Sequence, residues 1–294
     1  MANKKKQATW PFKIIFVLGF LILIYPQISR LYYRVQSSQE VSTFDQEKTK
    51  LTKEEVARRM ALAKDFNDSL VNSIAEDPYA KEKHKAGRAE YARMLEIHEQ
   101  IGHIQIPSID VDLPIRAGTG DGVLDTSAGH LEGTSLPIGG NSTHTVITAH
   151  SGLPKAKLFS DLKKVKLGDR FYIHNLAETL AYEVDQILVV EPSDFKNLLI
   201  VPGHDYATLL TCTPIMINSH RLLVRGHRVP YNKTIDDDFI LSNQMEYRYK
   251  YIFIGTLLFI LLMIALILYY NKKSKMLLAE IEKEKSKGGS YGQE

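Results

Sequence analysis

The chain has one cysteine, Cys212, and its sequence surroundings suit a nucleophile. Residues 208–211 before it are apolar or β-branched and Pro214 follows two positions later, so the thiol is expected at the end of a strand. A strand end presents a side chain to a substrate while the sheet holds its backbone. A single cysteine cannot form an internal disulfide. In an exported chain a free thiol is exposed to oxidation, so we expect it either to be buried or to have a function.

Two further residues supply the other groups of an acyl-transfer site. His150 ends a predicted strand at 145–150, and Arg221 opens the strand after the cysteine strand. A thiolate attacks a carbonyl carbon, an imidazole protonates the leaving amine, and a guanidinium holds the oxyanion. The loop at 213–220 joins the two later strands, so we expect Cys212 and Arg221 at the same end of the sheet.

Each of these residues also has a purely structural interpretation. Cys212 can be a buried core residue, and Arg221 can be a surface ion-pair residue. His204 lies closer in sequence to the cysteine than His150, and His220 directly precedes Arg221, so each is an alternative partner. The residue types suggest the chemistry, and only geometry can select the histidine.

The elements that must position these residues are predicted to be strands. Strands are expected within 104–115 and at 145–150, 170–174, 179–190, 207–212 and 221–229, with a Gly-rich loop at 118–140. Many short strands separated by turns are typical of a closed or nearly closed β-barrel. Helical spacing of apolar residues predicts helices at 52–68 and 86–98, and a short helix at 158–162.

Apolar segments flank this region. Residues 251–270 are twenty consecutive uncharged positions, enough to cross a hydrocarbon core of about 30 Å. The apolar run at 14–25 is shorter, and we interpret it as part of an uncleaved signal-anchor, with a cleaved signal peptide as the alternative. Lysines are concentrated outside both segments, so the positive-inside rule predicts cytoplasmic termini and an extracellular region between them.

The expected organisation follows from these patterns. It comprises a cytoplasmic N-terminus at 1–9, a signal-anchor at 10–29, an extracellular helical region with a lid at 30–100, a catalytic β-barrel at 101–232, a linker at 233–247, a transmembrane helix at 248–271 and a cytoplasmic tail at 272–294. The expected location is therefore the cell membrane, with membrane lipid as a partner.

Several function classes are disfavoured. A net charge of +3 gives no basic field for nucleic acid. The histidines and carboxylates lack the spacing of HExxH or EF-hand sites, so no metal is expected. The Gly-rich loop lacks the strand–GxGxxG–helix context of a nucleotide cofactor. The lysines between 155 and 166 are most simply a solvated face.

The residues around the cysteine resemble the sortase family of cysteine transpeptidases. Thr208-Leu209-Leu210-Thr211-Cys212 is similar to the TLxTC signature of that family, and His150 and Arg221 match its histidine and arginine. The resemblance covers about residues 75–230. It implies a sortase β-barrel with Cys212 as nucleophile, His150 as acid/base and Arg221 as the group that holds the oxyanion or positions the substrate.

A second motif narrows the resemblance to class C, the pilin-polymerising sortases. Asp77, Pro78 and Tyr79 are similar to the Asp-Pro-aromatic lid of that class, and the C-terminal apolar segment is similar too. The resemblance implies that Asp77 meets Arg221 and that the Tyr79 ring covers Cys212. An ordinary turn between helices is the alternative.

The implied reaction needs no cofactor. The partners would be pilin proteins with an LPxTG-like sorting signal and an acceptor lysine, joined through a cysteine thioester and then an isopeptide bond. Three alternatives stay open: a housekeeping sortase that anchors proteins to peptidoglycan, an exported cysteine peptidase that only hydrolyses, and a non-enzymatic membrane scaffold with two spans.

Overall fold

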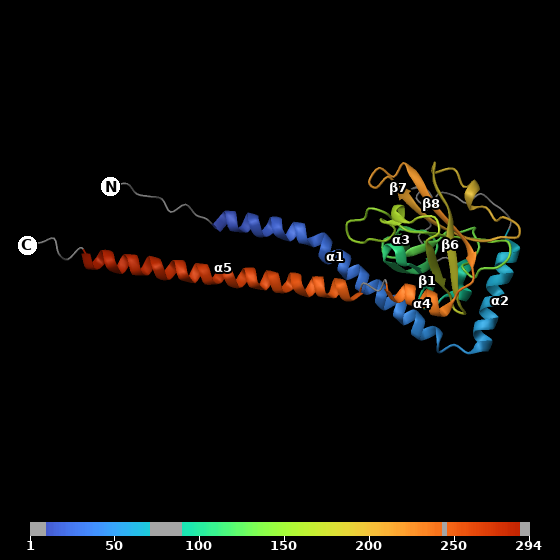
Figure 1. The fold of residues 1–294 in the computed structure, drawn as a ribbon, viewed down its shortest axis with the longest axis horizontal. Coiled ribbons are helices and arrows are strands. Elements are labelled where there is room, and N and C mark those ends of the chain that lie inside the picture. Colours follow the sequence, from blue (N-terminus) through green and yellow to red (C-terminus); the bar gives the residue numbers. More distant parts are fainter. Residues whose placement is uncertain (1–9, 71–89, 243–245, 289–294) are drawn as a thin grey trace, which may run out of the picture. The chain divides into compact units, whose positions relative to one another are not determined.

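The structure is a computed structural model that describes residues 10–70, 90–242 and 246–288. Two compact units, Met1–Asn243 and Gln244–Glu294, are described separately. Among the described residues of the first unit, eight strands form a closed barrel in the order β1-β2-β3-β4-β7-β8-β6-β5 (Figure 1). The strands are β1 Gln100–Ile106, β2 Val111–Ala117, β3 Ala128–His130, β4 Thr143–Thr148, β5 Arg170–His174, β6 Thr179–Val190, β7 Asp205–Thr213 and β8 His220–Val229. The expected closed barrel is confirmed.

Helices precede, interrupt and follow the barrel. The α-helices of the first unit are α1 Trp10–Lys48, α2 Lys53–Ser69, α3 Asp121–Leu124 and α4 Lys233–Ser242. The 3₁₀ helices are η1 Glu90–Leu95, η2 Pro107–Ile109, η3 Leu162–Lys164 and η4 Lys196–Leu198. The second unit contains α5, Glu246–Gly288. As expected, α2 starts after Thr52, whose side chain accepts a hydrogen bond from the Glu55 backbone N–H at 3.2 Å.

Two expected helices differ in the structure. The run at 158–162 is not a helix, because Leu158 has a φ of 40°, and a 3₁₀ turn forms instead at Leu162–Lys164. The run at 86–98 is described from Glu90 onward and is a 3₁₀ helix that ends at Leu95. His98 and Glu99 then adopt φ values of 49° and 69°, which turn the chain into β1 and prevent helix continuation.

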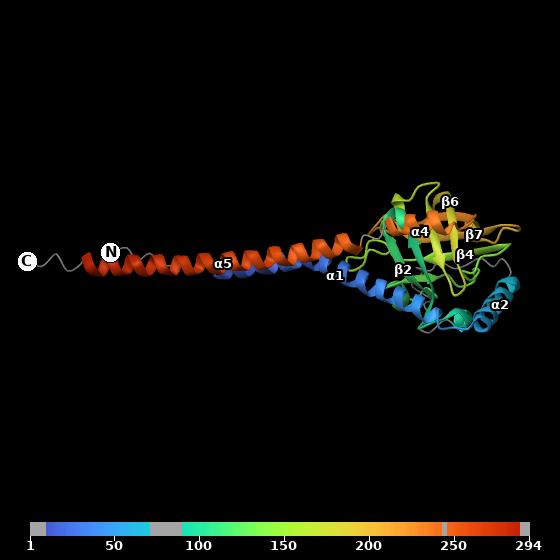
Figure 2. The same ribbon diagram turned by 60° about the horizontal axis from the view of Figure 1, so that its bottom comes forward.

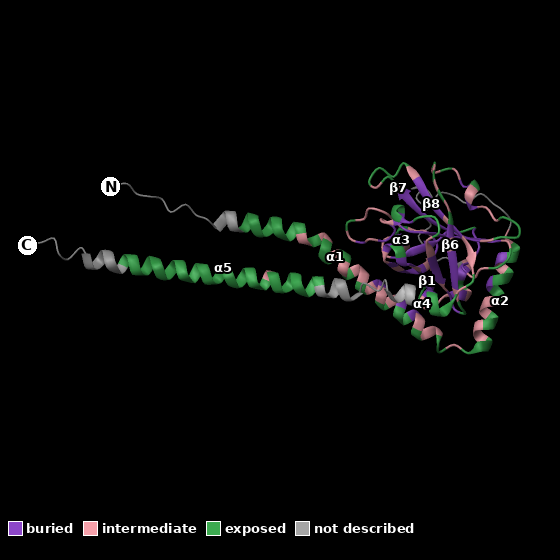
Figure 3. Cartoon of the chain, in the orientation of Figure 1, coloured by how far each residue is buried: buried purple, intermediate pink, exposed green. Residues whose placement is uncertain are grey.

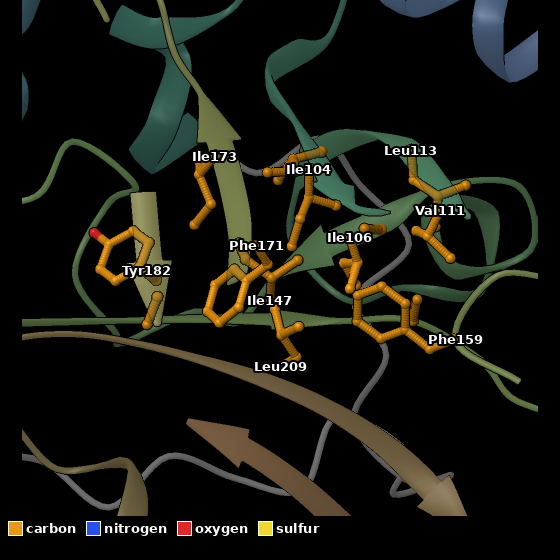
Figure 4. Packing of buried hydrophobic residues seen from close by; sticks show 14 of the residues in the cluster. Ile104, Ile106, Val111, Leu113, Ile147, Phe159, Phe171, Ile173, Tyr182 and Leu209 are labelled. Atoms are coloured by element: carbon orange, nitrogen blue, oxygen red, sulfur yellow. The ribbon is translucent and has the colours of Figure 1, made fainter. Parts of the chain in front are cut away.

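Alternate residues of the strands fill the barrel. Ile147 and Leu209 lie opposite each other on β4 and β7, and both are fully buried. Figure 4 shows these two side chains facing the interior together with Ile104 of β1. Burying each such side chain contributes about 1.5–3 kcal/mol, so this core holds the strand ends in fixed register.

The first helix is exposed at its start and packs on the barrel at its end. Residues 14–23 are exposed along the helix (Figure 3). Further on, Ser37, Val41 and Phe44 are buried at helical spacing, and this part of α1 lies along β2 (Figure 2). Arg34 binds both carboxylate oxygens of Asp110 at 2.6 Å. The helix therefore continues without a break from its apolar segment onto the barrel.

Two helices in the described part of the chain are long and apolar enough to cross a membrane. They are Ile14–Lys48 in α1 and Ile252–Glu282 in α5, and their most apolar windows are not buried. Exposed apolar helices of this length are stable in a bilayer and unfavourable in water. The two helices indicate membrane association.

A buried histidine links α1 to the barrel through contacts with two carboxylates. His103 on β1 lies between Asp45 of α1 and Asp112 of β2, with nitrogen–oxygen distances of 3.5 and 3.0 Å. Its ring stacks on His174 of β5 at a centroid distance of 4.1 Å. Burial alone would lower the pKa of His103, but the two carboxylates outweigh it and the pKa is raised. Burial and the charges of His103 and Lys48 hold the pKa of His174 well below its usual range.

The stability that His103 contributes to the first unit is therefore expected to decline as the pH rises, whereas His174, whose pKa is lowered, has its opposite effect below about pH 7. Folding makes His103 bind its proton more tightly, so its contribution is complete below the pKa of a free histidine, about 6.5, and is lost as the pH rises through the raised pKa. Thermal unfolding between about pH 7 and 9 would show a Tm decline in the wild type that is reduced in His103→Gln. His204→Gln, which alters an exposed histidine, is the matched control. An identical decline in His103→Gln would remove His103 as its source.

The segment after the barrel is also fixed to it. Residues 233–242, which the sequence suggests as part of a linker, form α4. Asp236 of this helix has a side chain that is 1% exposed. Tyr172 donates a hydrogen bond to Asp236 at 2.7 Å, Arg170 donates at 3.2 Å, and the Asn232 backbone N–H donates at 2.7 Å. Both chain segments that leave the barrel are thus held by buried polar contacts.

Candidate active site

Cys212, His150 and Arg221 come together as neighbours across adjacent strands. In the antiparallel pair of β7 and β8, Cys212 lies opposite Arg221. In the parallel pair of β4 and β7, Thr148 lies opposite Leu210, so continuing this register by two residues places His150 beside Cys212. Residues opposite each other project from the same face of a sheet. The three side chains therefore form one row, called here the Cys–His–Arg row.

The row lies at one end of the barrel and is partly protected. Cys212 is 7% exposed and Arg221 is 6% exposed, whereas His150 is half-buried. β4 and β7 finish at this end, and β8 begins there. A substrate carbonyl that reaches the thiol would thus meet a histidine from one neighbouring strand and an arginine from the other.

The register also separates the alternative histidines from the thiol. His204 precedes β7 at the opposite barrel end and stacks on Tyr206 at a centroid distance of 5.0 Å. His220 lies opposite Thr213, one residue beyond Cys212, so it projects from the other face of the sheet. Of the three histidines considered from the sequence, the geometry favours His150.

Two hydroxyl groups fix the backbone on either side of His150. Thr211 donates a hydrogen bond to the Ala149 carbonyl at 2.7 Å, and Ser151 donates one to the Cys212 carbonyl at 2.6 Å. The Ala149 backbone N–H also donates to the Leu210 carbonyl at 3.2 Å. Although β4 ends at Thr148, the chain thus remains beside β7 as far as the histidine. Neither hydroxyl role was anticipated from the sequence.

Backbone carbonyls orient the guanidinium of Arg221. Its Nη1 donates to the carbonyl oxygens of Asn218 and His220, each at 3.0 Å. Asn218 adopts a φ of 58°, which asparagine tolerates better than most residues. The Pro214 carbonyl accepts hydrogen bonds from the Ile217 and Asn218 N–H groups at 3.1 and 2.8 Å. The β7–β8 loop is thus a compact turn that holds the arginine side chain.

An apolar cluster adjoins the row on the same face of the sheet. It consists of Leu131, Val146, Phe195, Leu198, Leu210 and Leu223, with Leu188 and Val190 packed against it. Leu210 and Leu223 lie opposite each other, two residues along β7 and β8 from Cys212 and Arg221. The polar row therefore borders an apolar surface that is partly covered by the β6–β7 connection.

Gly152 lets the loop after His150 pack on the loop after Cys212. Its φ is 77°, and a Cβ there would lie 2.5 Å from Cγ2 of Ile215. Gly152→Ala is expected to destabilise the domain by about 1–3 kcal/mol and to reduce turnover, because the two loops must separate. Gly168→Ala is the matched control, since Gly168 has a φ of 85° with nothing within 4 Å of its Cβ position.

Thermal unfolding and peptide cleavage would be measured for both glycine variants. Gly168→Ala is expected to lose only the backbone contribution, about 1 kcal/mol, and to keep its turnover. Equal losses of stability and turnover in the two variants would show that the contact with Ile215 is unimportant.

The lid motif cannot be located here. Asp77, Pro78 and Tyr79 lie outside the described residues, so their role stays a prediction. Among the residues that are described, no group of three or more His, Cys, Asp or Glu side chains is arranged to hold a metal ion.

Comparison with known proteins defines the family. A model described as "Sortase domain" matches residues 104–229, which span most of the barrel and include the whole Cys–His–Arg row. Sortase C-1 from Streptococcus pneumoniae is 65% identical, with alignment over 66% of this chain and 100% of that chain and a TM-score of 0.65. The chain belongs to the sortase family.

Within that family, the solved structures are of the sortase C type. A pilus-related sortase C of Group B Streptococcus is 64% identical over 66% of this chain and 98% of that chain, with a TM-score of 0.63. Sortase A of Bacillus anthracis is 29% identical over 135 residues, which cover 46% of this chain and 62% of the relative. The chain thus spans about three fifths of that curated relative. The class C resemblance is confirmed by its solved neighbours.

Proposed function

We propose that this chain is a membrane-anchored transpeptidase that cleaves an LPxTG-like sorting signal and joins pilin subunits through a lysine. The observation that supports this most is the register that aligns His150, Cys212 and Arg221 on one face. A pilus-related sortase C is among the similar structures. This likeness supports pilins as substrates of the present chain.

In the first step, the thiolate of Cys212 attacks the carbonyl carbon of the threonine in the sorting signal. A carbon–sulfur bond forms and the threonine–glycine amide bond breaks. Protonated His150 gives its proton to the departing glycine amine, so the amine leaves neutral. Arg221 holds the negatively charged oxygen of the tetrahedral intermediate. The products are a thioester on Cys212 and the released C-terminal fragment.

In the second step, a neutral lysine amine of another pilin attacks the thioester carbonyl. An isopeptide bond forms, the carbon–sulfur bond breaks, and His150 accepts the lysine proton. The departing sulfur restores the thiolate. The apolar cluster beside the row would favour this amine over water, because it limits solvent on one side of the thioester.

The two apolar helices support placement at the cell membrane. By the positive-inside rule, both termini would be cytoplasmic and the barrel extracellular. Membrane lipid would contact both helices. This topology places the thiol on the side of the membrane where exported pilins are found.

A competition between acyl acceptors tests the proposal against its alternatives. The full chain in detergent would receive an LPxTG peptide together with a lysine-bearing pilin domain and a peptidoglycan stem-peptide amine. We expect the lysine-linked product to predominate. Predominance of the stem-peptide product would indicate a housekeeping sortase, and hydrolysis alone would indicate a peptidase. Absence of any acyl-enzyme or product would favour the scaffold.

The lid is proposed to regulate access to Cys212. Replacing both Asp77 and Tyr79 by alanine is expected to speed thiol labelling of Cys212 several-fold, because a carboxylate partner of Arg221 and a covering ring are both removed. The labelling rate would be measured by intact mass against time. Asp65→Ala, at an exposed position on α2, is the matched control. An unchanged rate in the double variant would contradict the lid.

A further inference from the structure

The connection between β4 and β5 carries a concentration of positive charge. Residues 153–169, called here the lysine loop, contain five lysines and two aspartates, which gives five minus two, or +3. The lysines are Lys155, Lys157, Lys163, Lys164 and Lys166. Next to them, Leu167 is 65% exposed. An exposed leucine beside lysines resembles the surface of proteins that rest in a membrane interface.

The internal contacts neutralise only part of this charge. Lys155 pairs with Asp125 at 2.9 Å, and Asp161 is shared between Lys157 and Lys164 at 3.2 and 2.8 Å. Within the described part of the chain, the exposed Lys163 and Lys166 lie within ion-pair distance of no carboxylate. Surplus positive charge is therefore directed to solvent at these two positions.

Core residues hold the lysine loop in place. Leu158, Leu162 and Val165 are each no more than 5% exposed and belong to the main core cluster. The Gly168 backbone N–H also donates a hydrogen bond to the Val184 carbonyl at 2.8 Å. The exposed lysines and Leu167 therefore form a preorganised surface, which binds with less loss of conformational entropy than a flexible segment.

The lysine loop contacts α1 next to its apolar segment. Ser29 of α1 donates a hydrogen bond to the Lys155 carbonyl at 3.3 Å, and Lys155 Nζ lies 6.0 Å from the centroid of the Tyr33 ring. Ser29 is the last residue of the segment that the sequence assigns to the membrane. Since α1 is continuous through this point, the loop lies close to where the helix leaves the bilayer. In Figure 1, loops on the left of the barrel lie beside the middle of α1, where Ser29 is.

We propose that the lysine loop seats the barrel on a bilayer surface rich in anionic lipid, with Lys163 and Lys166 at the phosphates and Leu167 in the headgroup region. This inference rests on α1 crossing the membrane. Charge complementarity and continuity with the spanning helix favour lipid over a soluble partner. Each lysine near an anionic bilayer adds to the attraction, and the attraction decreases within a Debye length. A helix that holds the lysines at a short, fixed distance from the surface therefore strengthens binding to anionic lipid.

The seating has a consequence for the active site. β5 begins directly after the lysine loop, and the barrel end where β5 begins is also the end where β4 and β7 finish. The Cys–His–Arg row therefore lies at the same end as the loop. A seated barrel keeps Cys212 close to the bilayer, within reach of substrates that are themselves still attached to the membrane.

Spin-label accessibility in lipid nanodiscs tests the seating. The full chain would carry Cys212→Ser and Leu167→Cys, with a nitroxide at position 167, in discs of phosphatidylcholine alone or mixed with phosphatidylglycerol. The measured quantity is accessibility to oxygen relative to a water-soluble nickel chelate. We expect this ratio to rise several-fold in the anionic discs. A label at exposed Asn141, before β4 at the opposite barrel end, is expected to show no rise.

Charge variants identify the residues responsible. Lys163→Gln with Lys166→Gln is expected to abolish the rise at position 167, whereas Lys53→Gln with Lys64→Gln on exposed positions of α2 retains it. The proposal would be overturned by an accessibility ratio that is equal in neutral and anionic discs. A ratio that rises only after a soluble polyanion is added would also overturn it. With Cys212 intact, the Lys163 and Lys166 variant cleaves a soluble peptide in detergent at the wild-type rate, so failure of the seating is distinguishable from failure of the proposed chemistry.

Discussion

Cys212→Ala is expected to abolish acyl-enzyme formation. The wild-type chain, incubated with an LPxTG peptide, would gain the mass of the acyl fragment, and the variant would show no adduct by intact mass spectrometry. Removing a covalent nucleophile reduces turnover by about 10⁴-fold or more. His150 and Arg221, the neighbours of Cys212 in the row, do not replace a thiol, because in the proposed mechanism one carries the proton and the other keeps its charge throughout.

The alanine variant is expected to remain folded. Cys212 is the penultimate residue of β7, and its backbone stays paired with β8 after the substitution. Losing one buried sulfur atom costs about 1 kcal/mol, which shifts Tm by a few degrees. Thr213→Ala is the control. It replaces the next residue, whose side chain projects from the other face of the strand, and it is expected to retain the adduct. An adduct in folded Cys212→Ala would place the nucleophile elsewhere.

Local signals in the sequence were sufficient to locate most strands. The strands at 170–174 and 179–190 have the bounds expected from their apolar residues and flanking turns. The order of strands was not predictable in the same way. β4 pairs in parallel with β7, and about sixty residues separate them, so the pairing depends on how the whole barrel closes. The sequence supports a barrel but does not determine its registers.

The same distinction separates the members of the candidate site. Cys212 and Arg221 lie on consecutive antiparallel strands joined by a short loop, so their proximity followed from sequence order. His150 is brought beside Cys212 only through the parallel β4–β7 pairing, and the sequence selected it by family resemblance. Thr211 and Ser151 had no signal of their own, because a hydroxyl that binds a backbone carbonyl across strands has no sequence spacing.

Polar contacts between distant segments were the least predictable feature. Arg34 and Asp110 are 76 positions apart, and each resembles an ordinary solvated charge in its local sequence. Asp236 stands in a run of three aspartates that suggests a polar linker, yet its side chain is buried against Tyr172 and Arg170. Such pairs form because the assembled fold brings the partners into hydrogen-bonding geometry, which offsets the cost of partial desolvation.

Arg221→Lys is expected to reduce kcat/KM for peptide cleavage by about 10²-fold, although the positive charge is kept. The guanidinium donates to the Asn218 and His220 carbonyls through Nη1, and its rigid planar fork presents N–H donors in a fixed geometry that suits a developing oxyanion. A lysine ammonium is a compact charge on a flexible stem and does not satisfy the carbonyls and the oxyanion in the same fixed geometry. Because the interaction strengthens in the transition state, kcat is expected to fall more than KM rises.

Arg225→Lys is the matched control for this substitution. Arg225 lies on the same strand and donates to both carboxylate oxygens of Asp185 at 2.9 and 3.2 Å, four residues along β8 from Arg221. Its replacement removes a paired guanidinium without touching the Cys–His–Arg row, so stability declines slightly and kcat stays near the wild-type value. Wild-type turnover in Arg221→Lys would mean that the site requires only a positive charge at this position. Equal losses in the two variants would instead indicate a general effect of replacing an arginine on β8.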